Sequence, residues 1–151
     1  MNRDMKQNIN SALLDNVFNE HADVLKKTHE QISKNIEISA DMIANSLKSS
    51  GTIFWCGNGG SAADSQHIAA EFVGRFKKDR RPLRSISLTT DTSVLTCVAN
   101  DYSYEEIFSR QLNALGRDGD VLVVITTSGK SENIKQALIQ ARNMGIKTIG
   151  L

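Results

Sequence analysis

The stretch Thr52–Ser61, TIFWCGNGGS, joins a short apolar run directly to a glycine-rich turn. An unbroken apolar run of this kind is typical of a strand covered on both faces of a parallel sheet, because a half-exposed strand alternates apolar and polar residues. Similar runs recur along the chain, at Ser85–Leu88, Val121–Ile125 and Lys147–Leu151. The sequence therefore predicts four buried parallel strands.

Helical segments separate these runs, and each begins at a serine. They are 62–76 after the cap Ser61, the segment from Ser103 (with Glu106 as its capping-box partner) to Gly116, and the segment from Ser131 to Gly145. The resulting order β-α-β-α-β-α-β predicts the α/β class. We expect an open parallel sheet with helices on both faces, flavodoxin-like layering and right-handed crossovers.

Long helices are predicted before this core, because residues 1–50 contain neither Gly nor Pro and carry apolar residues at helical spacing. A break near 19–23 would divide them into two helices. They could cap their own domain, but so long an apolar stripe is hard to bury in a short chain, and this favours an oligomer interface. We expect one domain over 1–151, with helices in 1–50 and the α/β core in 51–151. The last strand falls at the chain end with no crossover helix after it, so we also expect a C-terminal part of the fold to be missing.

Charge and cysteine content argue against several classes of protein. The chain has 18 basic and 17 acidic residues, a net charge of +1, which gives no electrostatic case for nucleic acid or membrane partners. Cys56 and Cys97 both lie in apolar stretches, and we interpret them as reduced core residues. The N-terminus is too polar for a signal peptide, and no apolar run approaches the length of a membrane span. These features predict a cytoplasmic protein.

The first glycine-rich loop, Gly57–Ser61, leaves a predicted strand and enters a helix, which is where open α/β sheets bind ligands. A nucleotide P-loop is excluded because no Lys stands beside Ser61. A dinucleotide fingerprint is matched only loosely, since the next acidic strand end, Asp91, lies too far along the chain. A cradle for a small phosphorylated ligand is favoured, and a tight turn without a ligand remains the plain alternative.

The second loop, TTSGKS at 126–131, gathers hydroxyls at the start of the next helix. Capping requires only one of them, so the surplus, with the free N–H groups and dipole of the helix start, indicates a phosphomonoester site. Lys130 could add positive charge.

Between the two loops, the predicted helix 62–76 carries Asp64, His67, Glu71 and Arg75 along one face. This pattern could be a solvated face with a Glu71–Arg75 ion pair. Alternatively, His67 and Glu71 converge on one ligand atom or one metal, with the carboxylate as a base beside a sugar carbonyl. Asn100 and Asp101, after the apolar segment 94–98, could form a turn or bind sugar hydroxyls.

Three segments together resemble the SIS-type (sugar isomerase) phosphoheptose isomerases: CGNGGSAADSQHIAAEFVGRF, LTCVANDYSYEEIFSRQL and GDVLVVITTSGKSENI, at 56–76, 95–112 and 119–134. The resemblance covers the whole chain, and the motifs keep the order and spacing of the family. It implies conversion of sedoheptulose 7-phosphate to glycero-manno-heptose 7-phosphate through an enediol. This reaction is the first step toward the ADP-heptose of lipopolysaccharide and related surface glycans.

The same resemblance implies roles for individual residues. Glu71 would be the catalytic base, and His67 and Glu71 would be two ligands of a zinc ion. The family is a homotetramer with sites at subunit interfaces, and Arg75 would reach a neighbouring site. The implied substrate-binding residues are Asn58, Gly59 and Gly60 at the sugar, Ser61, Thr126, Ser128 and Ser131 at the phosphate with Thr127 beside them, and Asn100 and Asp101.

The chain departs from the family in three ways. Thr126 and Lys130 stand where Ser and an uncharged residue are common, and the family's catalytic acid His and a zinc-binding Gln belong to a C-terminal region that this chain lacks. Two functions without catalysis are the alternatives. One is an SIS adaptor for the replication initiator, which lacks the glutamate matching Glu71, and the other is a sugar-phosphate sensor.

Overall fold

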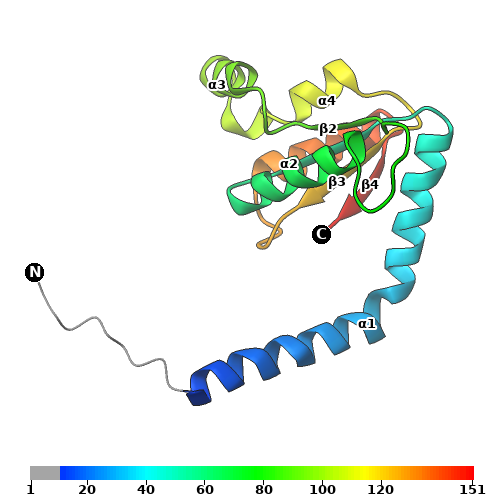
Figure 1. Cartoon of the computed structure of the whole chain (residues 1–151). Helices are drawn as coiled ribbons and strands as arrows, with labels where there is room; N and C mark the ends of the chain where they lie inside the picture. Colours follow the sequence, from blue (N-terminus) through cyan, green and yellow to red (C-terminus); the bar gives the residue numbers. More distant parts are fainter. Residues whose placement is uncertain (1–10) are drawn as a thin grey trace, which may run out of the picture. The chain divides into compact units, whose positions relative to one another are not determined.

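The computed structural model describes residues 11–151 (Figure 1). The first helix, α1, runs without interruption from Ser11 to Lys48. The prediction of a break near 19–23 is therefore wrong, because that segment contains no Gly or Pro and Asp23 forms an ion pair with Lys27 one turn later, at 2.6 Å. The predicted helix over residues 1–10 falls outside the described residues. No helix of the described chain is long and apolar enough to cross a membrane.

The chain divides into an N-terminal unit that ends at Ile38 and a second unit from Ser39 to Leu151. The second unit holds a four-stranded parallel sheet in the order β2-β1-β3-β4. Its strands, close to the predicted runs, are β1 (Ile53–Gly57), β2 (Ser85–Ser87), β3 (Val121–Ile125) and β4 (Lys147–Gly150). The α/β class and the parallel sheet are thus confirmed.

Helices cover both faces of this sheet, as predicted. On one face Phe54, Cys56, Leu122 and Val124 pack against α3 (Thr92–Asp101), α4 (Ser109–Leu115) and α5 (Glu132–Asn143). On the other face Ile53, Trp55, Val121 and Val123 pack against α2 (Gly60–Val73) and the C-terminal turns of α1. Successive strand residues point to opposite faces, so the unbroken apolar runs follow directly from a sheet buried on both sides.

The structure corrects the bounds of α2. The helix begins at Gly60 with Gly59 as its cap, so Ser61 lies inside the first turn and does not cap it. It ends at Val73, and Gly74 takes a non-helical conformation. Arg75 therefore lies beyond the helix, and the predicted face with Glu71 and Arg75 as a one-turn pair does not form.

The segment between β2 and β3 also differs from the prediction. Residues 92–101 form a helix, α3, whose start is capped by Asp91 through a 3.0 Å hydrogen bond from the Val94 N–H. Ser103 precedes a short 3-10 helix, η1 (Tyr104–Glu106), and its side chain makes no capping hydrogen bond. The capping box is therefore absent, although Gly116 ends α4 and Ser131 precedes α5 as expected.

Candidate active site

Adjacent strands β1 and β3 lead the chain to opposite faces of the sheet. Gly57, the last residue of β1, pairs with Ile125, the last residue of β3. The loop after β1 enters α2 on one face, and the loop after β3 enters α5 on the other. Such a divergence is a topological switch point, where open α/β sheets bind ligands beyond the carboxyl ends of their strands. Both predicted loops meet at this point.

The first loop, Gly57–Ser61, is tightly packed at Gly57, where it touches the start of α2, and open at Gly59 and Gly60. A Cβ on Gly57 would come within 2.7 Å of the Ser61 Cβ and carbonyl oxygen, so only glycine fits there. Gly59 has a φ of 57°, and nothing lies within 4 Å of a Cβ built on Gly59 or Gly60. The structure thus places Asn58, Gly59, Gly60 and Ser61 together at the start of α2, as predicted.

The second loop is shaped by its own hydroxyls. Thr126 Oγ1 accepts a hydrogen bond from the Gly129 N–H, and Ser128 Oγ accepts one from the Lys130 N–H, both at 3.2 Å. Gly129 permits the turn with a φ of 64°. Because each hydroxyl accepts here, its own hydrogen remains available to donate. Thr127 and Ser128 are exposed and Ser131 is half-buried at the start of α5.

Two side-chain amides join the loops. Asn58 Nδ2 donates to Asn133 Oδ1 at 2.9 Å, and Asn133 Nδ2 donates back to Asn58 Oδ1 at 2.8 Å. The Tyr104 hydroxyl, from η1, donates to the same Asn58 oxygen at 3.1 Å. Neither Asn133 nor Tyr104 was among the site residues predicted from the sequence. A signal existed for Asn133, which stands at a polar position directly before the buried Ile134 of α5.

His67 and Glu71 face each other one turn apart on α2, with His67 Nε2 at 3.6 Å from Glu71 Oε1. The His67 side chain is 75% exposed and the Glu71 side chain 36%. Both residues line a largely apolar hollow of about 490 Å³, whose other lining residues are Ile68, Phe72, Phe76, Arg80 and Leu83. The structure therefore brings His67 and Glu71 together, as the sequence predicted.

Glu71 is nevertheless remote from the two loops of its own chain. It follows Gly60 by eleven residues of helix, which corresponds to about 16 Å along the axis of α2. The hollow beside Glu71 contains no residue of either loop. Within one chain, the structure does not bring the predicted base to the predicted phosphate site.

Asn100 and Asp101 form the last turn of α3, so they are helical and not a loop. Asn100 Nδ2 donates to Asp101 Oδ1 at 2.8 Å, and the Cys97 thiol donates to Asp101 Oδ2 at 3.4 Å. These two hydrogen bonds, the one from Asn100 first, hold the pKa of the Asp101 carboxyl below its usual value. Cys97 is exposed, which corrects its assignment to the core, whereas Cys56 is buried as predicted.

Comparison with known proteins identifies the family. The SIS domain model matches residues 17–151. The phosphoheptose isomerase of Aquifex aeolicus is 53% identical over 133 residues, 88% of this chain and 70% of that protein. The phosphoheptose isomerase of Helicobacter pylori is 48% identical over 139 residues, which is 92% of this chain and 72% of that protein. The chain belongs to the SIS-domain phosphoheptose isomerases.

Solved phosphoheptose isomerases share the fold of the chain. The enzyme from Neisseria gonorrhoeae superposes with a TM-score of 0.85 at 38% identity, and that from Francisella tularensis with 0.88 at 34%. Each match covers 93% of this chain and 73% of the other. The likeness to both solved enzymes therefore extends over nearly all of this chain.

The residues present fit part of a zinc site. Two ligands held about 2.0–2.1 Å from a tetrahedral zinc ion lie about 3.3 Å from each other, close to the 3.6 Å between His67 Nε2 and Glu71 Oε1. Among residues 11–151, no group of three or more His, Cys, Asp and Glu side chains is arranged to hold a metal. The chemistry and spacing of this pair fit two donors of a zinc ion, and a four-coordinate site would need further ligands beside them.

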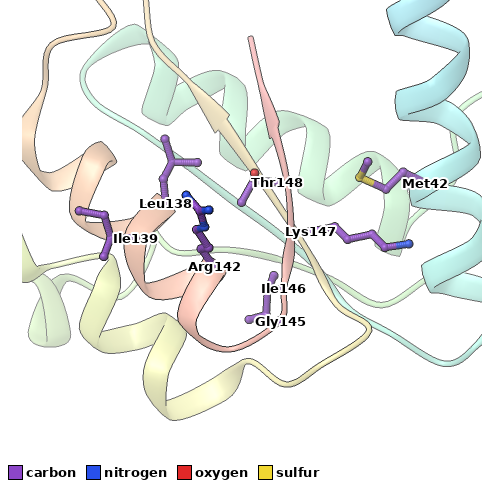
Figure 2. A pocket seen from close by; sticks show the side chains of 8 residues that line it. All are labelled: Met42, Leu138, Ile139, Arg142, Gly145, Ile146, Lys147 and Thr148. Carbon is purple, nitrogen blue, oxygen red and sulfur yellow. The ribbon is translucent and has the colours of Figure 1, made fainter.

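A second hollow, of about 670 Å³, lies along the edge strand β4. Figure 2 shows Met42 of α1 on one side of β4 and Leu138, Ile139 and Arg142 of α5 on the other. None of the predicted site residues lines it, and its walls are mostly aliphatic. This hollow therefore has no part in the candidate active site.

Proposed function

We propose that this phosphoheptose isomerase acts in the cytoplasm and interconverts sedoheptulose 7-phosphate and D-glycero-D-manno-heptose 7-phosphate. The product would enter the ADP-heptose route to lipopolysaccharide or a related surface glycan. The observation that carries the proposal is the Glu71 carboxylate beside His67 on α2, in a chain that also presents two hydroxyl- and amide-rich loops at its switch point. An adaptor or sensor without catalysis is not favoured, because the relatives are named as isomerases and Glu71 is present.

The proposed chemistry is a proton transfer between two neighbouring carbons. Glu71 removes a proton from C1 of the ketose while the C2 carbonyl oxygen takes up a proton, and the C1–C2 enediol forms. The proton then returns from Glu71 to C2 while the C1 hydroxyl gives up its proton, which yields the aldose. Ser61, Thr126, Ser128 and Ser131 would hold the phosphate by hydroxyl and backbone donors, with Thr127 beside them. Asn58, Gly59 and Gly60 would line the sugar, and Asn100 and Asp101 would contact its hydroxyls.

A complete site is proposed to form between subunits. The loops and Glu71 of one chain are separated by about 16 Å along α2, so the loops of one subunit would meet the Glu71 of another. The first helix offers a surface for assembly, because Phe18, Leu25 and Ile32 are exposed and recur every seven residues. Such a repeat is typical of helices that pack against other helices, and it supports the proposed homotetramer.

We further propose a zinc ion at His67 and Glu71, with other ligands outside the described pair. When bound, zinc would polarise the sugar carbonyl and its neighbouring hydroxyl. His67 would hold the ion, while Glu71 would either hold it or carry the proton between carbons.

The proposal is tested by assaying the purified full-length protein with sedoheptulose 7-phosphate and detecting the aldose product. Glu71→Gln keeps the size of the side chain but cannot accept the proton, so kcat should fall by roughly a thousandfold while substrate binding persists. Glu30→Gln, an exposed change on α1, is the matched control and should leave kcat unchanged. Absence of turnover by the wild-type protein, or full activity of Glu71→Gln, would refute the assignment.

A further inference from the structure

Asn58 forms a hydrogen-bonded cluster with Asn133 and Tyr104, two residues that have no role in the proposed reaction. It draws on the loop after β1, the first turn of α5 and the 3-10 helix η1. Asn133 is separated from Asn58 by 75 positions and Tyr104 by 46. The cluster is therefore a tertiary feature that links three elements at the switch point.

The hydrogen bonds within the cluster determine which groups of the Asn58 side chain remain for a ligand. A carboxamide oxygen has two lone pairs, and its nitrogen carries two hydrogens. Asn58 Oδ1 already accepts from both Asn133 Nδ2 and the Tyr104 hydroxyl, so both lone pairs are used. Asn58 Nδ2 uses one hydrogen on Asn133 and keeps the other. In this arrangement the Asn58 side chain can only donate to a ligand.

Burial makes the arrangement persistent. Asn133 is 2% exposed, so water cannot replace a lost partner without cost. If the Asn58 amide turned over alone, two oxygens would face each other and two nitrogens would face each other. The buried pair therefore opposes that rotation.

We infer that Asn133 and Tyr104 are positioning residues, which hold the Asn58 amide as a donor to an oxygen of the bound sugar phosphate. This inference rests on the proposed function and deepens it, because it assigns a binding polarity to one residue of the site. Neither positioning residue needs to touch the substrate. A donor suits the phosphate and hydroxyl oxygens that the two loops would surround.

The informative variant is Asn133→Asp. When the new carboxylate is ionised, it accepts from Asn58 Nδ2 but sets an oxygen against Asn58 Oδ1, so the pair is broken whichever way Asn58 turns. When it is protonated, its O–H donates to Asn58 Oδ1 and the pair is restored. Burial raises the pKa of a carboxyl group above about 4, so restoration should occur at mildly acidic pH.

The experiment compares the full-length wild-type protein with Asn133→Asp in turnover of sedoheptulose 7-phosphate from about pH 8 to about pH 5. The variant should raise KM about tenfold at the alkaline end with little change in kcat, and the variant-to-wild-type ratio of KM should fall toward one as the pH falls. Tyr104→Phe should raise KM about fivefold at every pH. Asn113→Asp, which alters an exposed amide that accepts from Gln140, is the matched control.

Several outcomes would overturn the inference. A merely structural role would lower kcat through loss of active protein and leave KM unchanged. A variant-to-wild-type ratio of KM that does not depend on pH would also contradict it.

If the wild-type protein shows no turnover, the proposed function fails. The inference is then tested by NMR, which measures the hydrogen exchange of the two side-chain amide protons of Asn58. One of the two should exchange slowly in wild type, because it is donated to Asn133 Oδ1. In Asn133→Asp its protection should be weaker at high pH, where the carboxylate repels Asn58 Oδ1, than at low pH, where the protonated carboxyl restores the pair. Equal, fast exchange of both protons in wild type would sink the inference.

Discussion

Arg80 Nη2 donates a 2.7 Å hydrogen bond to the backbone carbonyl of Glu71. The same guanidinium donates to the carbonyl of Phe72 at 2.9 Å and to that of Gly74 at 3.2 Å. The last carbonyls of a helix lack partners within the helix, and a cation there also suits the negative end of its dipole. The loop after α2 thus closes the helical turn that carries the proposed catalytic base.

Arg80→Ala should therefore reduce both stability and activity. We expect a loss of about 2 kcal/mol in the free energy of unfolding, since several charge-assisted hydrogen bonds disappear, measured by urea denaturation. kcat should fall several-fold because the turn that holds Glu71 loosens. Arg80→Lys, which keeps the charge but not the fork of donors, should recover only part of the stability.

The neighbouring Arg81 provides the control for charge alone. Arg81 is exposed, and Arg81→Ala removes the same charge from the same loop. Its effect should stay within about 0.5 kcal/mol. Equal losses for the two alanine variants would show that the Arg80 hydrogen bonds do not stabilise the end of α2.

Zinc affinity should depend on His67. The His67→Ala variant of the full-length protein should bind zinc at least about tenfold more weakly than wild type, since one nitrogen donor of the proposed site is lost. Competition with a chromophoric chelator measures the zinc affinity of each protein. His29→Ala, an exposed change on α1, should keep the wild-type affinity, and zinc binding that is indifferent to His67 would rule out the proposed ligand.

The fold was accessible from sequence because its strands carry a strong signal. The runs around β1 and β3 are apolar at every position, and only burial on both faces explains such runs. The two ligand-binding loops could also be predicted, because glycines and hydroxyl side chains gather directly after the strands β1 and β3. The turns of α5 were equally clear, since Ile134, Ala137 and Ala141 are buried at helical spacing.

Other features depend on tertiary structure and could not be found in this way. The short apolar segment 94–98 is ambiguous between strand and helix, and packing decides that it belongs to α3. Asn133 meets Asn58 because β1 and β3 are neighbours in the sheet, and Tyr104 reaches the same amide from η1, which lies elsewhere in the chain. Cys97 is apolar in context but lies on the outward side of α3, where no local pattern separated it from the core.

Asp120 should be essential for stability but not for chemistry. It is 1% exposed, and its two oxygens accept from the Thr52 N–H at 2.7 Å and the Arg117 N–H at 2.8 Å. Asp120→Asn replaces one acceptor by an NH2 group that faces an N–H, which should cost about 2–3 kcal/mol in the free energy of unfolding. Urea denaturation of this variant against the exposed change Asp118→Asn tests the expectation, and equal midpoints would contradict it.

The two thiols should differ sharply in reactivity. Burial raises the pKa of Cys56 to about 12, so its thiol stays protonated and inaccessible in the folded protein. Cys97 is exposed, but its hydrogen bond to Asp101 and the negative charge of that carboxylate raise its pKa above the usual value. A raised pKa means less thiolate at any given pH, so Cys97 should react with a disulfide reagent at pH 8 more slowly than a free cysteine does.

Asp101→Asn removes the negative charge beside Cys97 and should move the thiol pKa back down. More thiolate then forms at the same pH, and labelling should accelerate. Asp91→Asn, at the other end of the same helix, keeps an N-capping oxygen and should leave the rate unchanged. Reaction of the thiols with the disulfide reagent, followed by absorbance, should reveal one reactive thiol in the native protein and two after unfolding. A second reactive thiol in the native state would mean that Cys56 is accessible, and an unchanged rate in Asp101→Asn would mean that the carboxylate does not restrain Cys97.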